Sequence, residues 1–152
     1  MMGRPGLVFV YGTLLAGSGT PANLWLEQRS AALGAASVPG RMIAIPTRLG
    51  WYPALLPARN PRQRVHGMLM RLDFRPGDWR WLDHYEGVEY RLSRIWAAGR
   101  AVHAYRWAAA IPKGAMPIKQ GDFLRWLGET GRQPYCEPPP RHQARSRPFD
   151  RA

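Results

Sequence analysis

Leu7-Val8-Phe9-Val10-Tyr11-Gly12-Thr13-Leu14 is the stretch from which the rest of the sequence can be placed. Its first five residues are aliphatic or aromatic, and the run stops at Gly12. This pattern predicts a buried first strand that leads into a loop. The loop continues to Pro21 and contains three glycines. Thr20 and Pro21 then suit the cap and first turn of a short helix over residues 23–28.

The rest of the chain alternates short apolar runs with Gly and Pro, which favours short strands and loops. Strands are predicted over residues 33–45, 51–56, 65–72, 90–97 and 101–109. A short helix is predicted to begin with Asp78 as its N-cap and to end at Gly87 in a left-handed conformation. A final helix is predicted over residues 119–127. Consecutive hairpins argue against a purely parallel sheet, so we expect an α+β fold with a mixed, partly closed β-barrel and short helices.

The length of 152 residues suits one domain with its own core. We place this domain at residues 1–131. From residue 132 to residue 152 the composition shifts to Pro, Arg and Gln, with three consecutive prolines at 138–140. Such a composition predicts a basic, disordered tail that the domain can lose without losing stability.

The formal net charge of +12 attracts anionic partners in general. The arginines are scattered rather than clustered, which favours a solvated basic surface over a nucleic-acid partner. The single cysteine, Cys136, excludes an internal disulfide and suits a cytoplasmic protein. No apolar stretch is long enough to span a bilayer, so we expect no membrane partner. The sequence gives no indication of the oligomeric state.

The four histidines and the single cysteine lack the spacings of protein metal sites, so we expect no metal and no cofactor. A first positive signal is Gly12 at the end of the first strand. Without a side chain there, the backbone can approach a ligand closely, and successive N–H groups of the turn can bind a carboxylate. A substitution such as Gly12→Val would then block the ligand. An ordinary turn between strand and loop is the alternative.

A second signal is Leu82-Asp83-His84-Tyr85-Glu86-Gly87. Glu86 falls in the last turn of the predicted helix, where the helix dipole disfavours a carboxylate. Aromatic neighbours and Asp83, three residues earlier, should both raise the pKa of Glu86. A carboxyl group of this kind suits general acid/base catalysis. The alternative is that Asp83 and Glu86 are solvated acids on a helix surface.

Several short motifs recur here in the order seen in one known family. They are Tyr11-Gly12-Thr13-Leu14, Asn23, Tyr52-Pro53-Ala54-Leu55, Val65-His66-Gly67-Met68-Leu69, Leu82 to Gly87, and Tyr90-Arg91. With these motifs in this order, the chain resembles the γ-glutamylcyclotransferase-like family, which includes γ-glutamylamine cyclotransferases and AIG2-like proteins. The resemblance covers about residues 7–128 and implies a mixed barrel with a pocket at one mouth.

The resemblance also implies a function. Active members release 5-oxoproline from γ-glutamyl amines or γ-glutamyl amino acids by an intramolecular acyl transfer and use no cofactor. The substrate-binding loop corresponds to Tyr11, Gly12, Thr13 and Leu14, and the catalytic residue corresponds to Glu86. The alternative is a non-catalytic relative that binds a small amine or amino acid in the same pocket.

Overall fold

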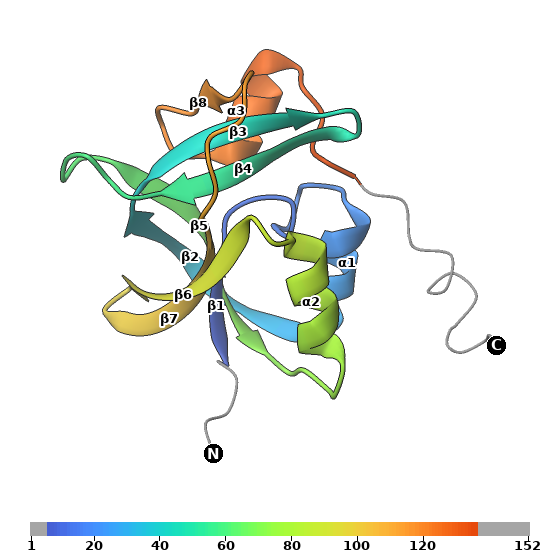
Figure 1. Cartoon of the computed structure of the whole chain (residues 1–152). Helices are drawn as coiled ribbons and strands as arrows, with labels where there is room; N and C mark the ends of the chain where they lie inside the picture. Colours follow the sequence, from blue (N-terminus) through green and yellow to red (C-terminus); the bar gives the residue numbers. More distant parts are fainter. Residues whose placement is uncertain (1–5, 137–152) are drawn as a thin grey trace.

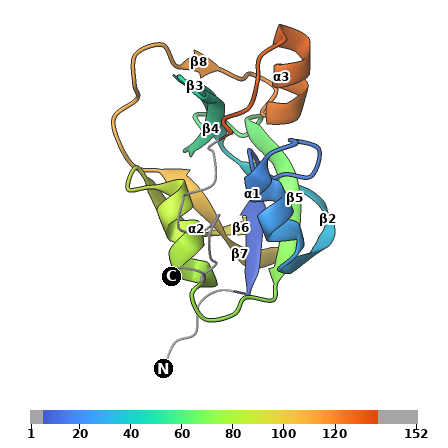
Figure 2. The same cartoon turned by 90° about the vertical axis from the view of Figure 1, so that its right-hand side faces the viewer.

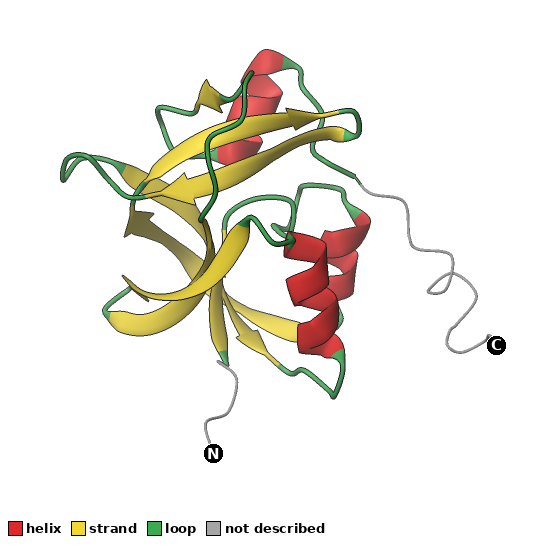
Figure 3. Ribbon diagram, in the orientation of Figure 1, coloured by secondary structure: helices red, strands yellow, loops and turns green. Residues whose placement is uncertain are grey.

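The computed structural model describes residues 6–136, which form eight strands and three short helices (Figures 1 and 3). The strands are β1 (Leu7–Val10), β2 (Ser30–Pro39), β3 (Arg41–Thr47), β4 (Gly50–Leu56), β5 (Arg64–Leu72), β6 (Tyr90–Ala97), β7 (Arg100–Trp107) and β8 (Met116–Pro117). The helices are α1 (Pro21–Glu27), α2 (Asp78–Glu86) and α3 (Phe123–Thr130). In this described part of the chain, none of the helices is long and apolar enough to cross a membrane.

The strands form two sheets. The larger sheet has the order β2-β5-β1-β7-β6, and the smaller one has the order β4-β3-β8. In the larger sheet, β1 runs antiparallel to β5 and parallel to β7, so the sheet is mixed. Figure 1 shows the β3–β4 hairpin lying across one end of the larger sheet, with α1 and α2 beside that sheet. This arrangement confirms the predicted α+β fold with a partly closed barrel.

The central position of β1 explains why its sequence is apolar without a break. Side chains of a strand alternate between the two faces of a sheet. Phe9 and Tyr11 belong to the core between the two sheets. Val10 belongs to a second core, together with Leu26 of α1 and Leu82 of α2. Because both faces of β1 are covered, both sets of side chains must be apolar.

Several helix ends differ from the predictions. Thr20 caps α1 as expected, because its hydroxyl oxygen accepts a hydrogen bond from Asn23 N. Asp78 is not the cap of α2 but its first residue, and the cap is Gly77 at φ +93°. Gly87 ends α2 at φ +91° and ψ 173°, which is a glycine conformation but not the left-handed helical one. The final helix begins after Asp122, later than predicted.

The first residues of the predicted tail lie against β4. Trp51 N donates to Gln133 O at 2.9 Å, Tyr135 N donates to Trp51 O at 2.6 Å, and Cys136 N donates to Leu49 O at 3.1 Å. These bonds place Tyr135 on the barrel. The rest of the predicted tail, residues 137–152, lies outside the described residues, and its disorder stays a prediction.

Candidate active site

A pocket of about 350 Å³ opens between the end of β1, the strand β4, the C-terminal end of α2 and the segment that carries Tyr135. It contains all five residues that the sequence singled out: Tyr11, Gly12, Thr13, Leu14 and Glu86. Its other polar and aromatic lining residues are Phe9, Thr47, Tyr52, His84, Tyr85, Glu89, Tyr90, Tyr105 and Tyr135. The fold therefore brings the loop after the first strand and the end of α2 to one cavity.

Gly12 lets the loop approach β4 closely. A Cβ atom at this position would lie 2.7 Å from Pro53 Cδ and closer still to Pro53 Cγ. Leu15 N donates to Gly12 O at 2.9 Å, which closes a tight turn over residues 12–15. The structure thus gives Gly12 a reason that the sequence did not predict, because a side chain there would meet Pro53.

Buried polar groups hold this turn in place from behind. The hydroxyls of Ser18, at 3.0 Å, and of Thr20 both donate to Thr13 O. Asn23 Nδ2 donates to Leu14 O at 3.0 Å. These bonds satisfy the carbonyl oxygens of the turn. Among the described residues, the backbone N–H groups of Thr13 and Leu14 have no acceptor, so they are available to a ligand in the pocket.

We expect Thr20→Val to destabilise the protein by about 1–3 kcal/mol, because it leaves buried polar groups without their partners. Thr20 is 2% exposed, caps α1 and bonds the turn, while valine keeps the shape but loses the hydroxyl. Urea midpoints measure the change. The control is Thr130→Val, since Thr130 is exposed and bonds only within α3. Equal midpoints for the two variants would show that the Thr20 hydroxyl does not support the turn.

Glu86 is the last residue of α2, and Gly87 N donates to Asp83 O at 3.0 Å to end the helix. Glu86 lines the pocket and is partly buried. Burial, and after it the Asp83 carboxylate, raise the pKa of Glu86 from 4.5 to about 8. Within the described residues, nothing donates a hydrogen bond to this carboxyl group to counter those two effects. The predicted direction of the pKa shift agrees with the structure.

Two hydrogen bonds fix α2 relative to the barrel. Tyr105 of β7 donates to Asp83 Oδ1 at 2.5 Å. The hydroxyls of Thr13 and Tyr85 lie 2.7 Å apart and share a hydrogen bond. The first contact holds the carboxylate that acts on Glu86, and the second joins α2 to the loop. Both contacts lie between elements that are distant in the sequence.

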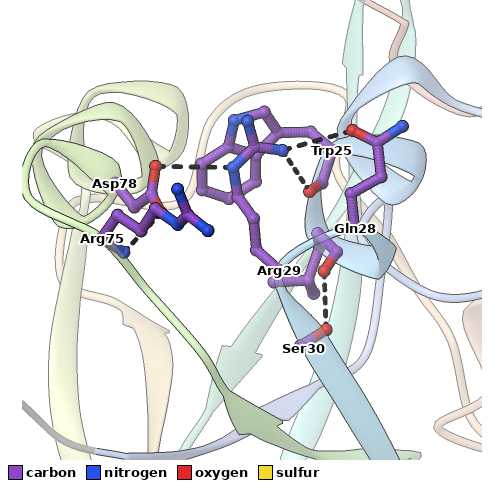
Figure 4. Close-up of polar contacts among 7 residues, drawn as sticks. Trp25, Gln28, Arg29, Ser30, Arg75 and Asp78 are labelled. Carbon is purple, nitrogen blue, oxygen red and sulfur yellow. Dashed lines mark hydrogen bonds and ion pairs between the residues drawn. The ribbon is translucent and has the colours of Figure 1, made fainter.

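The opposite end of α2 is attached to α1 through Arg29 (Figure 4). Its Nη1 donates to Trp25 O at 2.8 Å, and its Nε lies 3.4 Å from Asp78 Oδ1. Trp25 also stacks on Trp81 of α2, with 4.0 Å between the ring centroids. Arg75 N donates to the other carboxylate oxygen, Asp78 Oδ2, at 2.8 Å. Figure 2 shows the two helices from the side.

Five tyrosines of the pocket were not among the predicted site residues: Tyr52, Tyr85, Tyr90, Tyr105 and Tyr135. The Tyr90 hydroxyl donates to Pro53 O at 2.6 Å. Burial raises the pKa of Tyr90 well above 10, and the charges of Tyr11 and Glu86 raise it further. Tyr90 therefore stays neutral beside Glu86. Spacing could not reveal Tyr52, Tyr105 and Tyr135, because contacts between distant parts of the chain bring them to the pocket.

The pocket is lined by acidic residues, although the chain as a whole is basic. Its described lining residues include two acids, Glu86 and Glu89, and neither Lys nor Arg, although the chain has 22 basic residues. Residues 6–136 contain no group of three His, Cys, Asp or Glu side chains that could hold a metal ion.

Comparison with known families gives one match over most of the chain. The family model described as gamma-glutamyl cyclotransferase, AIG2-like matches residues 8–125. Comparison with curated protein sequences gives no match.

Several solved structures share the fold. An AIG2-like protein from Mus musculus is 20% identical with a TM-score of 0.64, over 91% of this chain and 100% of that chain. An uncharacterized protein from Pyrococcus horikoshii is 20% identical with a TM-score of 0.63, over 82% of this chain and 95% of that chain. Allophanate hydrolase from Kluyveromyces lactis is 13% identical with a TM-score of 0.69, over 84% of this chain but only 22% of that chain. At these identities the likeness concerns the fold.

Proposed function

Because this chain belongs to the gamma-glutamyl cyclotransferase, AIG2-like family, we propose that it releases 5-oxoproline from a γ-glutamyl amine or a γ-glutamyl amino acid. The observation that carries the proposal is that Glu86 and the turn over residues 12–14 line one pocket. The turn supplies hydrogen-bond donors for a carboxylate, and Glu86 supplies a group for proton transfer. A cytoplasmic location, suggested by the single cysteine, belongs to the same proposal.

The turn would hold the α-carboxylate of the substrate. The described lining residues include neither Lys nor Arg, whereas the backbone amides of Thr13 and Leu14 line the pocket and have no acceptor among the described residues. Adjacent N–H groups in a turn can bind an anion. With the carboxylate held there, the γ-glutamyl chain can fold so that its α-nitrogen reaches its own γ-carbonyl carbon.

The reaction needs proton transfers at two nitrogens. The α-ammonium group gives one proton to the Glu86 carboxylate, and the free amine attacks the γ-carbonyl carbon. A C–N bond of the new five-membered ring forms and the original amide C–N bond breaks. The α-nitrogen loses two protons in total, and the leaving amine departs with both. Because attack is intramolecular, positioning and proton transfer are the contributions left to the protein.

The pKa of about 8 suits Glu86 to both steps. A group whose pKa is near the operating pH can accept a proton and then give it back. Proton acceptance requires the carboxylate, so turnover should rise as the pH approaches 8. Tyr11, whose hydroxyl donates to Tyr105 O at 2.5 Å, stays neutral because burial and the Glu86 charge raise its pKa well above 10.

Asp83→Asn should shift the rising limb of the pH–rate profile toward lower pH. The substitution removes the like charge that raises the pKa of Glu86, so the carboxylate forms at lower pH. Asn keeps an oxygen that can accept from the Tyr105 hydroxyl. The measurement is kcat between pH 5 and 9. As a control, Asp73→Asn removes the same charge outside the pocket and should leave the profile unchanged; identical shifts in both variants would contradict a specific role for Asp83.

The test of the proposed function is an assay for 5-oxoproline. γ-Glutamyl amines, γ-glutamyl dipeptides and glutathione should be supplied in turn, with the free amine measured in parallel. Release of 5-oxoproline and amine in equal amounts supports the proposal. If none of these compounds is converted while one of them binds, the protein is a non-catalytic relative that uses the same pocket for binding.

A further inference from the structure

The mouth of the pocket has an aromatic lining that comes from three separate parts of the chain. Tyr52 lies on β4, Tyr85 on α2 and Tyr135 on the C-terminal segment, and all three line the pocket. The rings of Tyr52 and Tyr135 have centroids 5.7 Å apart and stand at 83° to each other. The rings of Tyr85 and Tyr135 are 6.4 Å apart at 57°. We call these three residues the tyrosine cage.

The position of Tyr135 is set by its own segment. Its backbone N–H donates to Trp51 O at 2.6 Å, and the Arg132 guanidinium lies 5.1 Å from the centroid of the Trp51 ring. Gly50, at φ +117°, makes room for this segment, because a Cβ there would lie 2.6 Å from Pro134 C and closer to Pro134 O. Thus β4 holds Tyr135 at the pocket by backbone contacts.

Tyr135 lies beyond the region that matches the family, which ends at residue 125. The turn at residues 12–14 and Glu86 lie within that region. The two parts of the pocket therefore have different origins in the sequence: the proposed reaction centre lies in the family region, and one wall of the mouth comes from a segment after it.

The mouth is also acidic. Glu89 lines the pocket, and its Oε1 would be 3.2 Å from a Cβ at Gly87. Glu89 lies near enough to Tyr52 that its charge, after burial, raises the pKa of that hydroxyl. The described lining residues include neither Lys nor Arg to compensate. Tyrosine rings standing across one another beside a carboxylate form an environment that binds organic cations.

We propose that the tyrosine cage and Glu89 form the subsite for the leaving amine and select a substituent that carries a positive charge. This proposal rests on the proposed cyclotransferase function. The carboxylate end of the substrate would lie at the amides of residues 13–14, and the amide bond would lie near Glu86. The far end of the amine then extends into the mouth, where ring faces and the Glu89 carboxylate stabilise a cation.

The experiment uses two probes that bind without reacting. They are the glutaric acid monoamides of 1,4-diaminobutane and of n-pentylamine, which lack the α-amine and so cannot cyclise. The two have chains of equal length and differ in whether the end is an ammonium or a methyl group. Calorimetry on the full chain at pH 7 should show the ammonium probe binding about 2- to 30-fold more tightly, the range expected for a cation on aromatic rings. Equal affinities would overturn the proposal.

Variants test whether the ring of Tyr135 itself, and not a general disturbance of the fold, produces the preference for the ammonium probe. Tyr135→Phe keeps the ring and should keep the preference, while Tyr135→Leu should bring the two affinities close together. Gly50→Ala displaces the segment and Glu89→Gln removes the charge, and both should also reduce the preference. The matched control is Trp96→Leu, since Trp96 is 65% exposed on β6 and does not line the pocket. A preference unchanged in Tyr135→Leu would overturn the role of the cage.

Turnover distinguishes this proposal from the function on which it rests. The γ-glutamyl derivatives of the same two amines are supplied to the parent chain, and 5-oxoproline is measured. Equal kcat/KM for both substrates would overturn the subsite and leave the cyclotransferase function standing. Selective binding of the ammonium probe without any release of 5-oxoproline would leave the subsite standing and overturn the function.

Discussion

Replacing Glu86 with Gln should lower turnover of a γ-glutamyl substrate about 10²- to 10⁴-fold, the usual contribution of a general acid/base. Gln has nearly the same size and can form hydrogen bonds, but it cannot take a proton from the α-ammonium group and deliver it to the leaving amine. The proposed carboxylate contacts come from the amides of residues 13–14, which the substitution does not touch. Binding of a non-reacting γ-glutamyl analogue should therefore change little.

The Glu86→Gln variant should also be more stable than the parent at neutral and basic pH. In the unfolded chain the carboxyl group ionises near 4.5, whereas in the folded protein its pKa is about 8. The contribution of Glu86 to stability is thus greatest below pH 4.5 and is lost as the pH rises to 8. Between pH 5 and pH 8, the melting temperature should fall less for the Gln variant than for the parent. Turnover near the parent rate would show that Glu86 is not the proton carrier.

Substituting Gly12 with Val should destabilise the protein by about 1–3 kcal/mol or more, as expected when atoms are forced into a packed site. Pro53 Cδ would lie 2.7 Å from the new Cβ, and Pro53 is held in β4 with its carbonyl bonded to Tyr90. The proline ring has few alternative conformations, so the loop itself must move. Since this loop supplies the amides of Thr13 and Leu14, ligand affinity should fall with stability.

The control for Gly12→Val is Gly128→Val in α3, where an added Cβ meets no atom within 4 Å. Both variants lose a glycine and gain the same side chain, so the difference in their urea midpoints reports the contact with Pro53. Binding of 5-oxoproline by calorimetry gives the second readout. A folded Gly12→Val protein with parent-like stability and weaker binding would restore the original interpretation, in which Gly12 makes room for the ligand itself.

The sequence was informative where local rules decide the structure. The unbroken apolar run from Leu7 to Tyr11 predicted a buried strand, and β1 is buried on both faces. Thr20 followed by Pro21 predicted the start of α1 correctly, because a capping hydroxyl acts within three residues of itself. Asp78 shows the limit of the same rule. It has the right residue type at a helix start, but it is the first residue of α2, and its carboxylate binds Arg75 N, three residues earlier, and Arg29 from a distant part of the chain.

The candidate site divides in the same way. Gly12 and Glu86 could be identified because each lies at the end of a predicted element, and the direction of the Glu86 pKa shift followed from its place in the helix and from Asp83. The positions of Tyr52, Tyr105 and Tyr135 could not be predicted, because they reach the pocket through strand pairing and through the bonds of the C-terminal segment to β4. A tail composition that favours disorder gave no signal for Tyr135.

From its sequence alone, the chain determines the order of its three helices, the buried first strand, the cap of α1 and the acid at the end of α2. These features depend on contacts within a few residues, which periodicity and residue type report directly. The tertiary structure alone decides that Gly12 accommodates Pro53, that Tyr105 holds Asp83, and that Tyr135 completes the mouth of the pocket. Those contacts join residues far apart in the chain, and their geometry depends on how the two sheets and the helices pack together.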